Sequence, residues 1–269
     1  VMTPKSGIYK NVAVADVNSM YPNIITGFNI SPETLVDREK HTFSQEKSGL
    51  LSDIVKYVLA ERYKYKELAK NSFKAGNVQE HDVYKMIEHQ FKDTNFRLFD
   101  IAIASAITYY GRQILASVIN FLATEKQEFE VLGADTDSCF VHYKGNSANV
   151  IELFDNLEQD INNFLSKHWT DKMLSFNIKM EVETIFSFLI MPPAKKTYIG
   201  LTLLLKGAKK NNEMYAKGFQ LIRKDTPAGL KPLLQRFYYA FLNNVSINDT
   251  QAIKQDLKQM QKDLKTMHH

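Results

Sequence analysis

The chain has 269 residues, of which 44% are hydrophobic and 24% charged, and its formal net charge is +4. This composition is typical of one large or two modest globular domains, and it excludes an intrinsically disordered chain. The single cysteine, Cys139, excludes an internal disulfide framework and a thiolate metal cluster, and it fits a reducing compartment. The sequence lacks an 18-residue apolar run and a signal-peptide pattern, so we expect a soluble, intracellular protein without a membrane segment.

The first half of the chain predicts one strand and a helical hairpin. Residues 11–16, N-V-A-V-A-D, have the pattern of a buried strand that ends in the carboxylate of Asp16. Apolar residues at helical spacing then predict a long amphipathic helix with Ser52 as its N-cap. A turn is expected within residues 70–80, and a second helix over about residues 80–92.

The second half predicts further strands between helices. The expected elements are an apolar helix at 99–122, a β-hairpin with arms at 131–132 and 139–141, an amphipathic helix at 149–169, strands within 178–205 and helices from Gly229 onward. This order of elements favours an α+β fold with an antiparallel sheet.

Positive charge is concentrated in one late segment. Between Lys195 and Lys231 there are nine Lys or Arg residues and two acids, Glu213 and Asp225, so the segment carries +7 and the rest of the chain −3. A basic block of this size favours a polyanionic partner. A solvated, lysine-rich surface is the alternative that charge alone leaves open.

Two carboxylates stand at the bend of the predicted β-hairpin. In G-A-D-T-D-S, residues 133–138, Asp135 and Asp137 are two positions apart, and such residues point to the same side of an extended chain. Carboxylates this close repel each other, which costs free energy unless a cation is nearby. The motif alone also fits a solvated turn, because Asp and Ser are common turn residues.

A third carboxylate, Asp16, ends the neighbouring predicted strand, so three carboxylates can meet at one edge of the sheet. Mg²⁺ is bound by one or two carboxylates together with substrate phosphates. Two such ions support an in-line phosphoryl transfer. We therefore predict that the carboxylates hold divalent metal.

The residues after Asp16 carry a family resemblance. D-V-N-S-M-Y-P-N-I-I, residues 16–25, resembles the D-x-x-S-L-Y-P-S-I motif of family B DNA polymerases, and G-A-D-T-D-S resembles their Y-G-D-T-D-S motif. The two occur in the family's order, with the helical hairpin where the family has its fingers domain. The resemblance implies a template-directed DNA polymerase that adds deoxynucleotides to a primer 3′-hydroxyl. Its partners would be primer-template DNA and deoxynucleoside triphosphates.

The resemblance also implies a metal site. Asp16 and Asp137 would hold two Mg²⁺ ions, for which Mn²⁺ can substitute, and the Val17 carbonyl would be a further ligand. Asp135 would complete the acidic site. Glu181 and Glu183 match acidic family positions near the active site, although a structural role is an equal alternative for each.

The incoming nucleotide would contact two groups of residues. Near the first strand, Ser19, Met20 and Tyr21 would line its sugar and triphosphate, with Tyr21 as the steric gate against a 2′-hydroxyl. On the helical hairpin, the matching cations are Arg62 and Lys66, four residues apart on one helix face, and Lys85. Developing charge on a triphosphate needs such cations. Without the resemblance, an exposed basic face would be the simpler interpretation.

Two stretches depart from the family pattern. After Lys85, the sequence has His89, Gln90, Lys92 and Asp93 where the motif K-x-x-x-N-S-x-Y-G has Asn, Ser, Tyr and Gly. The next piece, F-R-L-F-D-I-A-I-A-S-A-I-T, resembles T-even phage polymerases but begins several residues early, which suggests a viral or mobile-element origin. In the acidic motif, Gly133 stands where Y-G-D-T-D-S has its aromatic residue. We expect an altered pocket for the nascent base pair and looser packing at the primer end.

The basic segment contains two further family-like motifs. K-K-T-Y, residues 195–198, resembles the K-K-x-Y motif, and K-G-F-Q-L-I-R-K-D, residues 217–225, resembles the segment between palm and thumb. The residues expected to contact DNA through its backbone and minor groove are Lys195, Lys196, Tyr198, Lys217, Arg223 and Lys224.

By the same resemblance, the chain divides into palm (residues 1–40), fingers (41–94), a second part of the palm (95–222) and the beginning of a truncated thumb (223–269). We expect a piece of a longer protein that acts at sites of DNA replication, in nucleus or cytoplasm. A proofreading domain and a processivity factor are left open. Two alternative functions are a degenerate polymerase that binds primer-template DNA without efficient extension, and a metal-dependent nuclease.

Overall fold

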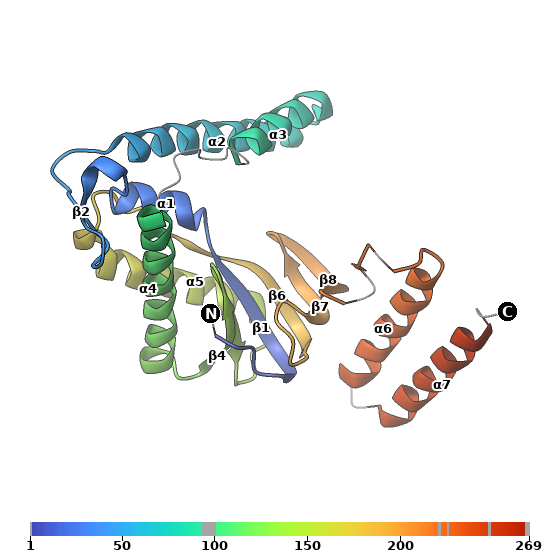
Figure 1. Cartoon of the computed structure of the whole chain (residues 1–269). Coiled ribbons are helices and arrows are strands. Elements are labelled where there is room, and N and C mark those ends of the chain that lie inside the picture. Colours follow the sequence, from blue (N-terminus) through green and yellow to red (C-terminus); the bar gives the residue numbers. More distant parts are fainter. Residues whose placement is uncertain (1, 93–100, 220–221, 225, 247–248, 267–269) are drawn as a thin grey trace. The chain divides into compact units, whose positions relative to one another are not determined.

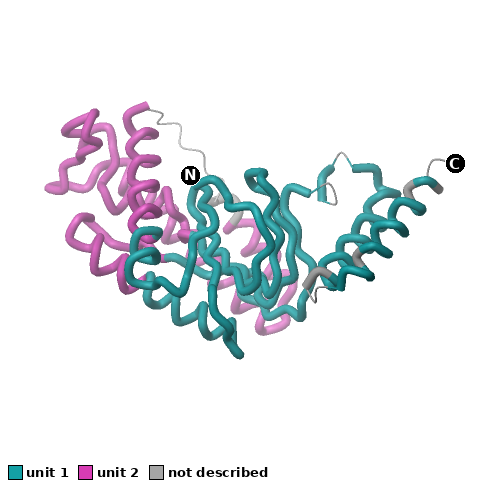
Figure 2. Tube along the Cα trace, turned by 90° about the horizontal axis from the view of Figure 1, so that it is seen from below, with its two compact units in different colours: residues 1–16, 119–161, 180–269 teal, residues 17–118, 162–179 magenta. Residues whose placement is uncertain are grey.

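The computed structural model describes residues 2–92, 101–219, 222–224, 226–246 and 249–266. The chain forms two compact units, which Figure 2 shows in different colours: residues 1–16, 119–161 and 180–269 form the first, and residues 17–118 and 162–179 the second. Helices and an antiparallel sheet are both present, which confirms the expected α+β class. The predicted division into palm, fingers and thumb stays a prediction.

A six-stranded sheet forms the centre of the first unit (Figure 1). Its strands are β1 (Gly7–Val17), β4 (Phe129–Asp135), β5 (Ser138–Tyr143), β6 (Met180–Met191), β7 (Tyr198–Leu205) and β8 (Ala208–Lys217). Their spatial order is β4-β5-β1-β6-β7-β8. The pairs β1–β5, β4–β5, β6–β7 and β7–β8 are antiparallel, and the predicted hairpin of residues 131–141 is therefore confirmed as β4 and β5.

Apolar side chains fix the sheet against its neighbours. One fully buried cluster joins strands β1, β4, β6 and β7 through Val12, Leu132, Phe186, Leu189, Met191 and Tyr198. Helix α5 (Val150–Trp169) buries Phe154 against Phe129 of β4, with their ring centroids 5.9 Å apart. Burying a side chain such as Phe154 contributes about 1.5–3 kcal/mol. The sheet is therefore a rigid base for the residues at its edge.

The second unit contains the expected helical hairpin. It consists of α2 (Leu50–Lys74) and α3 (Val78–Lys92), which pack against each other along their length. The unit also holds α1 (Met20–Gly27), the 3-10 turn η1 (Pro32–Thr34), the short strands β2 (Leu35–Asp37) and β3 (Thr42–Phe43) and the first part of α4 (Ile101–Glu125). The turn between α2 and α3 is short because Gly76 adopts a positive φ of 76°.

The predicted N-cap of α2 was wrong. The helix begins three residues earlier, with Gly49 as its N-cap, and Ser52 is buried inside it, where its hydroxyl donates to the Ile25 carbonyl (3.0 Å). The first free amides are satisfied from a distant segment: Leu50 N–H donates to the Glu33 carboxylate, and Leu51 N–H to the Ser31 hydroxyl (3.1 Å). A cap supplied by tertiary contact leaves no local sequence signal.

Strand β8 was missed by the strand pattern, which ended at residue 205. Its sequence A-K-K-N-N-E-M-Y-A-K is polar and mostly exposed because it forms the edge of the sheet, where charged residues are common. The helical tail is confirmed as α6 (Leu230–Ser246) and α7 (Thr250–Thr266), joined by an Arg236–Asp263 ion pair at 2.8 Å. No helix within the described residues has the length and apolar character that crossing a membrane requires.

Replacement of Gly200 by Ala should destabilise the sheet. A Cβ at this β7 position would overlap the Phe188 carbonyl oxygen and lie 2.8 Å from the Phe186 ring. We expect Gly200→Ala to lower the free energy of unfolding by about 1–3 kcal/mol, the usual cost of overpacking. Denaturant unfolding measures this. Gly133→Ala, whose Cβ would lie 3.1 Å from Pro4, is the matched control and should cost less; an equal or larger loss there would contradict the close-packing explanation.

Candidate active site

Strand register places Asp16 and Asp135 on either side of one residue. Asp16 of β1 and Asp135 of β4 both pair with Ser138 of β5, so they lie in one row across three neighbouring strands. Antiparallel partners point to the same face of a sheet. The fold thus brings together two carboxylates that are 119 positions apart in the chain.

Asp137 reaches this row by a turn. Its amide donates to the Asp135 carbonyl (2.7 Å), and Thr136 between them has a positive φ of 56°. The chain therefore reverses direction between the two carboxylates, which confirms that they stand at the bend of the predicted hairpin. The turn still keeps the two charges close enough for Asp135 to raise the pKa of Asp137.

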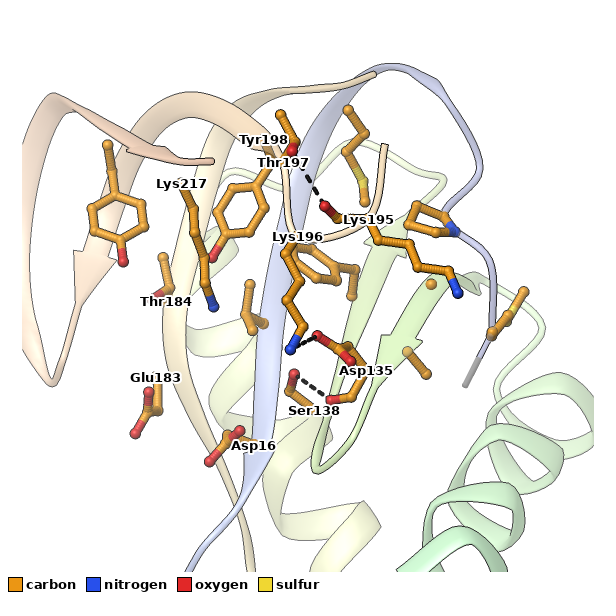
Figure 3. A pocket seen from close by; sticks show the side chains of 18 of the residues that line it. Asp16, Asp135, Ser138, Glu183, Thr184, Lys195, Lys196, Thr197, Tyr198 and Lys217 are labelled. Atoms are coloured by element: carbon orange, nitrogen blue, oxygen red, sulfur yellow. Dashed lines mark hydrogen bonds and ion pairs between the residues drawn. The ribbon is translucent and has the colours of Figure 1, made fainter. Parts of the chain in front are cut away.

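Asp16 and Asp135, but not Asp137, border a pocket of about 150 Å³, shown in Figure 3. Asp16, Asp135 and Glu183 line it together with four lysines, Lys195, Lys196, Lys206 and Lys217. The apolar part of its lining includes Val14, Phe140, Met191 and Tyr198. The pocket therefore combines acidic and basic groups, an arrangement suited to a polyanion bound through cations.

Burial and mutual repulsion perturb the acidic groups. Burial, and then the charges of Asp137 and Glu183, raise the pKa of Asp16 to about 7, while Lys217 opposes the rise. Burial is also the first cause of the raised pKa of Asp137. One lysine forms a direct ion pair here: Lys196 Nζ lies 3.4 Å from Asp135 Oδ2 (Figure 3). The ionised forms of Asp16 and Asp137 are therefore disfavoured in these surroundings unless a cation is near.

This donor set fits a hard divalent cation that has additional ligands. Carboxylate oxygens are the donors that Mg²⁺ prefers, and uncompensated repulsion is relieved when such an ion binds. Within the described residues, no group of three or more His, Cys, Asp or Glu side chains is arranged to hold a metal ion. An ion at Asp16 would therefore need backbone, water or substrate oxygens as well, as is usual for Mg²⁺ at phosphate-binding sites.

The basic residues expected to contact DNA have different surroundings. Lys195 and Lys196 are exposed on the loop after β6, and Lys217 is the last residue of β8. This loop lies close to the end of β8, since a Cβ at Gly218 would be 2.5 Å from the Lys196 carbonyl oxygen. Arg223 and Lys224 are exposed between β8 and α6.

Tyr198 belongs mainly to the core. Only 8% of it is exposed, and its ring packs against Phe140, with centroids 5.0 Å apart, and against Phe186. Burial and the neighbouring Tyr215 raise the pKa of its hydroxyl. A ligand can therefore meet only the edge of Tyr198 that lines the pocket.

The residues expected to meet the nucleotide lie in the second unit. Ser19 has a positive φ of 48° just before α1, and its hydroxyl accepts a hydrogen bond from Arg62 Nη1 (2.9 Å). Met20 is only 4% exposed and packs near Gly111, so its backbone rather than its side chain is left for a ligand. Tyr21 is 40% exposed, and Lys66 is exposed one turn after Arg62.

The structure adds a residue that the motifs did not indicate, Glu88. It lies between two of the expected cations, with Arg62 Nε at 3.5 Å and Lys85 Nζ at 3.0 Å from its carboxylate oxygens. Arg62 and Lys85 therefore converge across the helical hairpin. An acidic residue three positions after Lys85 was the only sequence signal for this arrangement.

The departures from the family pattern have different outcomes. Asp93 and the side chains of His89, Gln90 and Lys92 lie outside the described residues, so the expected alteration of the base-pair pocket stays a prediction. At Gly133, the backbone of Pro4 occupies the space beside the glycine, where a Cβ would lie 3.1 Å from Pro4 Cα. A large side chain there would require the N-terminal segment to shift.

A family model for DNA polymerase family B matches residues 1–269, the whole chain. The chain belongs to DNA polymerase family B. It is 30% identical to DNA polymerase II of Escherichia coli over 91% of this chain and 33% of that protein. It is also 25% identical to DNA polymerase 1 of Sulfolobus acidocaldarius (98% of this chain, 30% of that protein) and 27% identical to the DNA polymerase of Archaeoglobus fulgidus (84% and 28%).

This family B chain spans about a third of the length of the curated relatives it matches. The relatives named above come from a bacterium and two archaea, so they give no support to the expected viral or mobile-element origin. The family B motifs that carried the resemblance are the ones that contribute Asp16, Asp135 and Lys196 to the pocket.

Burial of Asp16, together with the negative charges near it, predicts a pH-dependent stability. Its pKa of about 7 in the folded protein lies above the ordinary 3.8, so stability is lost as pH rises between these values. Without metal, Asp16→Asn should therefore be more stable than the wild type, by about 1–2 kcal/mol after allowance for solvent screening.

Thermal unfolding in a metal chelator between pH 5 and pH 8 measures this difference. The stabilisation by Asp16→Asn should grow up to about pH 7 and then level off, because the folded carboxyl is ionised above its pKa. Asp155→Asn, on the exposed side of α5, is the control and should give no such trend. A pH-independent difference at Asp16 would contradict the raised pKa.

Proposed function

We propose that this chain is the catalytic part of a template-directed DNA polymerase that acts at sites of DNA replication. The reaction is attack of a primer 3′-hydroxyl oxygen on the α-phosphate of a deoxynucleoside triphosphate, with release of pyrophosphate. The observation that carries the proposal is the pocket in which Asp16 and Asp135 lie with Lys195, Lys196 and Lys217, in a chain that belongs to DNA polymerase family B.

Asp16, Asp137 and the Val17 carbonyl would hold the metal ions, with Asp135 completing the acidic site. Bound there, two Mg²⁺ or Mn²⁺ ions supply Lewis-acid activation of the hydroxyl and neutralise charge on the triphosphate. The raised pKa of Asp16 and of Asp137 supports this assignment, because both groups are stabilised as anions when a cation is near. Lys196 and Lys217 supply the positive charge that the protein itself brings.

The nucleotide would be held by residues of the second unit. Arg62, Lys66 and Lys85 would pair with the triphosphate, where fixed cations stabilise charge that develops during phosphoryl transfer. Tyr21 is exposed enough to contact the sugar, and its ring would exclude a 2′-hydroxyl by size. Ser19 and the backbone of Met20 would complete this part of the site.

The DNA would be held by the basic residues of the first unit. Lys195, Lys196, Lys217, Arg223 and Lys224 would contact phosphates, and the exposed edge of Tyr198 would lie near the primer terminus. Such contacts position a duplex without reading its sequence, as template-directed synthesis requires. Residues 1–40 and 95–222 would form the palm, 41–94 the fingers and 223–269 the beginning of the thumb.

Primer extension tests this function. With Mg²⁺ and a short primer-template, the chain should incorporate deoxynucleotides in preference to ribonucleotides. Asp137→Asn should lower the rate at least about 100-fold, the scale for loss of one preorganised electrostatic group. Asp155→Asn is the matched control and should leave extension unchanged. DNA binding without extension at any metal concentration would favour the degenerate polymerase instead, and metal-dependent loss of unprimed DNA would favour a nuclease.

DNA affinity should depend steeply on salt. Each neutralised phosphate contributes about 0.9 to the slope of log affinity against log salt concentration. Lys195→Ala should therefore weaken binding and reduce the slope by roughly this amount, as measured by fluorescence anisotropy with labelled duplex. Lys144→Ala, just beyond the end of β5 that is remote from Asp137, is the control. An unchanged slope for Lys195→Ala would remove that residue from the DNA interface.

A further inference from the structure

Glu88 is a buried carboxylate held by two cations on the α2–α3 hairpin. Only 7% of the residue is exposed, and its two carboxylate oxygens are shared between Arg62 and Lys85. Burial by itself raises the pKa of a carboxyl, but hydrogen bonding and charge from Lys85, with the charge of Arg62, hold the pKa of Glu88 below its usual range. Glu88 is therefore an anion in the folded protein.

The ion pairs continue into a polar chain that reaches the residue before α1, Ser19, whose hydroxyl donates to Asn18 Oδ1 (3.2 Å). Arg62 uses Nε toward Glu88 and Nη1 toward the Ser19 hydroxyl, at 2.9 Å. Tyr63 also donates to the Ser19 hydroxyl (3.4 Å). The Arg62 guanidinium therefore lies between two partners: the Glu88 carboxylate, which forms an ion pair with Nε at 3.5 Å without a hydrogen bond, and the Ser19 hydroxyl, to which Nη1 donates.

We propose that Glu88 occupies, in the nucleotide-free protein, the position between Arg62 and Lys85 that the triphosphate takes on binding. This rests on the proposed function, in which Arg62 and Lys85 hold the triphosphate. Glu88 is then a positioning residue: it keeps two like charges close together without ligand, and each nucleotide that binds must displace it. Nucleotide affinity is consequently lower than it would be if Arg62 and Lys85 had no carboxylate between them.

Burial strengthens the interaction of Glu88 with its two cationic partners. An anion that shares its partners in a poorly solvated place holds them more strongly than an exposed carboxylate does. The incoming triphosphate carries more charge and therefore wins the exchange, but it gains only the difference between the two sets of contacts. Glu88 should therefore change nucleotide affinity more than it changes the rate of the chemical step that follows binding.

The test compares Glu88→Gln with Asp82→Asn. Gln keeps the shape of Glu88 but removes its charge, while Asp82 is an exposed carboxylate on the same helix and controls for loss of one negative charge. We expect the KM for deoxynucleotide to fall about 3- to 10-fold in Glu88→Gln, with the change falling on KM rather than kcat. Asp82→Asn should leave both constants unchanged.

Binding of inorganic tripolyphosphate separates this inference from the proposed function. It requires no DNA, no primer extension and no base or sugar contact, so it can be measured by calorimetry even in a chain that does not extend primers. Tighter binding of tripolyphosphate to Glu88→Gln than to the wild type supports the inference whether or not extension occurs. Equal or weaker binding overturns it, also when the chain is an active polymerase.

Measurements in an Arg62→Gln background distinguish competition between Glu88 and the triphosphate from a purely structural ion pair. If Glu88 acts through Arg62, the gain in tripolyphosphate affinity from Glu88→Gln should shrink when Arg62 is already Gln, whereas a general change in the hairpin would give the same gain in both backgrounds. Glu88→Met keeps the buried volume filled and serves if the Gln variant unfolds. Thermal unfolding of each variant shows which ones are folded, and an undiminished gain in the Arg62→Gln background overturns the inference.

Discussion

Repulsion between carboxylates at the end of β1 and in the β4–β5 turn is the constraint on which this site depends. A sheet register places Asp16 and Asp135 on either side of Ser138, and a tight turn adds Asp137. Such a cluster is unfavourable in a protein without a counter-charge. The buried hydrophobic cluster of the sheet contributes stability that offsets this cost, and the burial and mutual repulsion of the carboxylates make the place suitable for divalent cations.

On the helical hairpin, positive charges rather than negative ones lie close together. There Arg62 and Lys85 converge, and a carboxylate of the protein, Glu88, lies between them. In the first unit, Lys196 has the corresponding relation to Asp135. In both places a side chain of the protein partly compensates the charge of groups that the proposed function assigns to the site.

Local sequence signals were sufficient for much of the fold. The apolar alternation before Asp16, the hairpin around residues 131–141 and the helical spacing after residue 50 each correspond to an observed element. The two features that the sequence did not predict correctly have one physical cause in common. Each is held by hydrogen-bond partners that lie elsewhere in the sequence. The start of α2 is capped by Glu33 and Ser31, and the polar strand β8 is ordered by its pairing with β7.

The sequence by itself determined the family, because two motifs in a set order, with a helical hairpin between them, are properties of the chain alone. It also determined which residue types were available for a metal and a triphosphate. Only the tertiary structure decided their surroundings: that Tyr198 is packed in the core, that the side chain of Met20 is buried, and that Glu88 lies between two cations. Burial and ion pairing depend on contacts between distant segments, and a motif specifies the residues but not what packs around them.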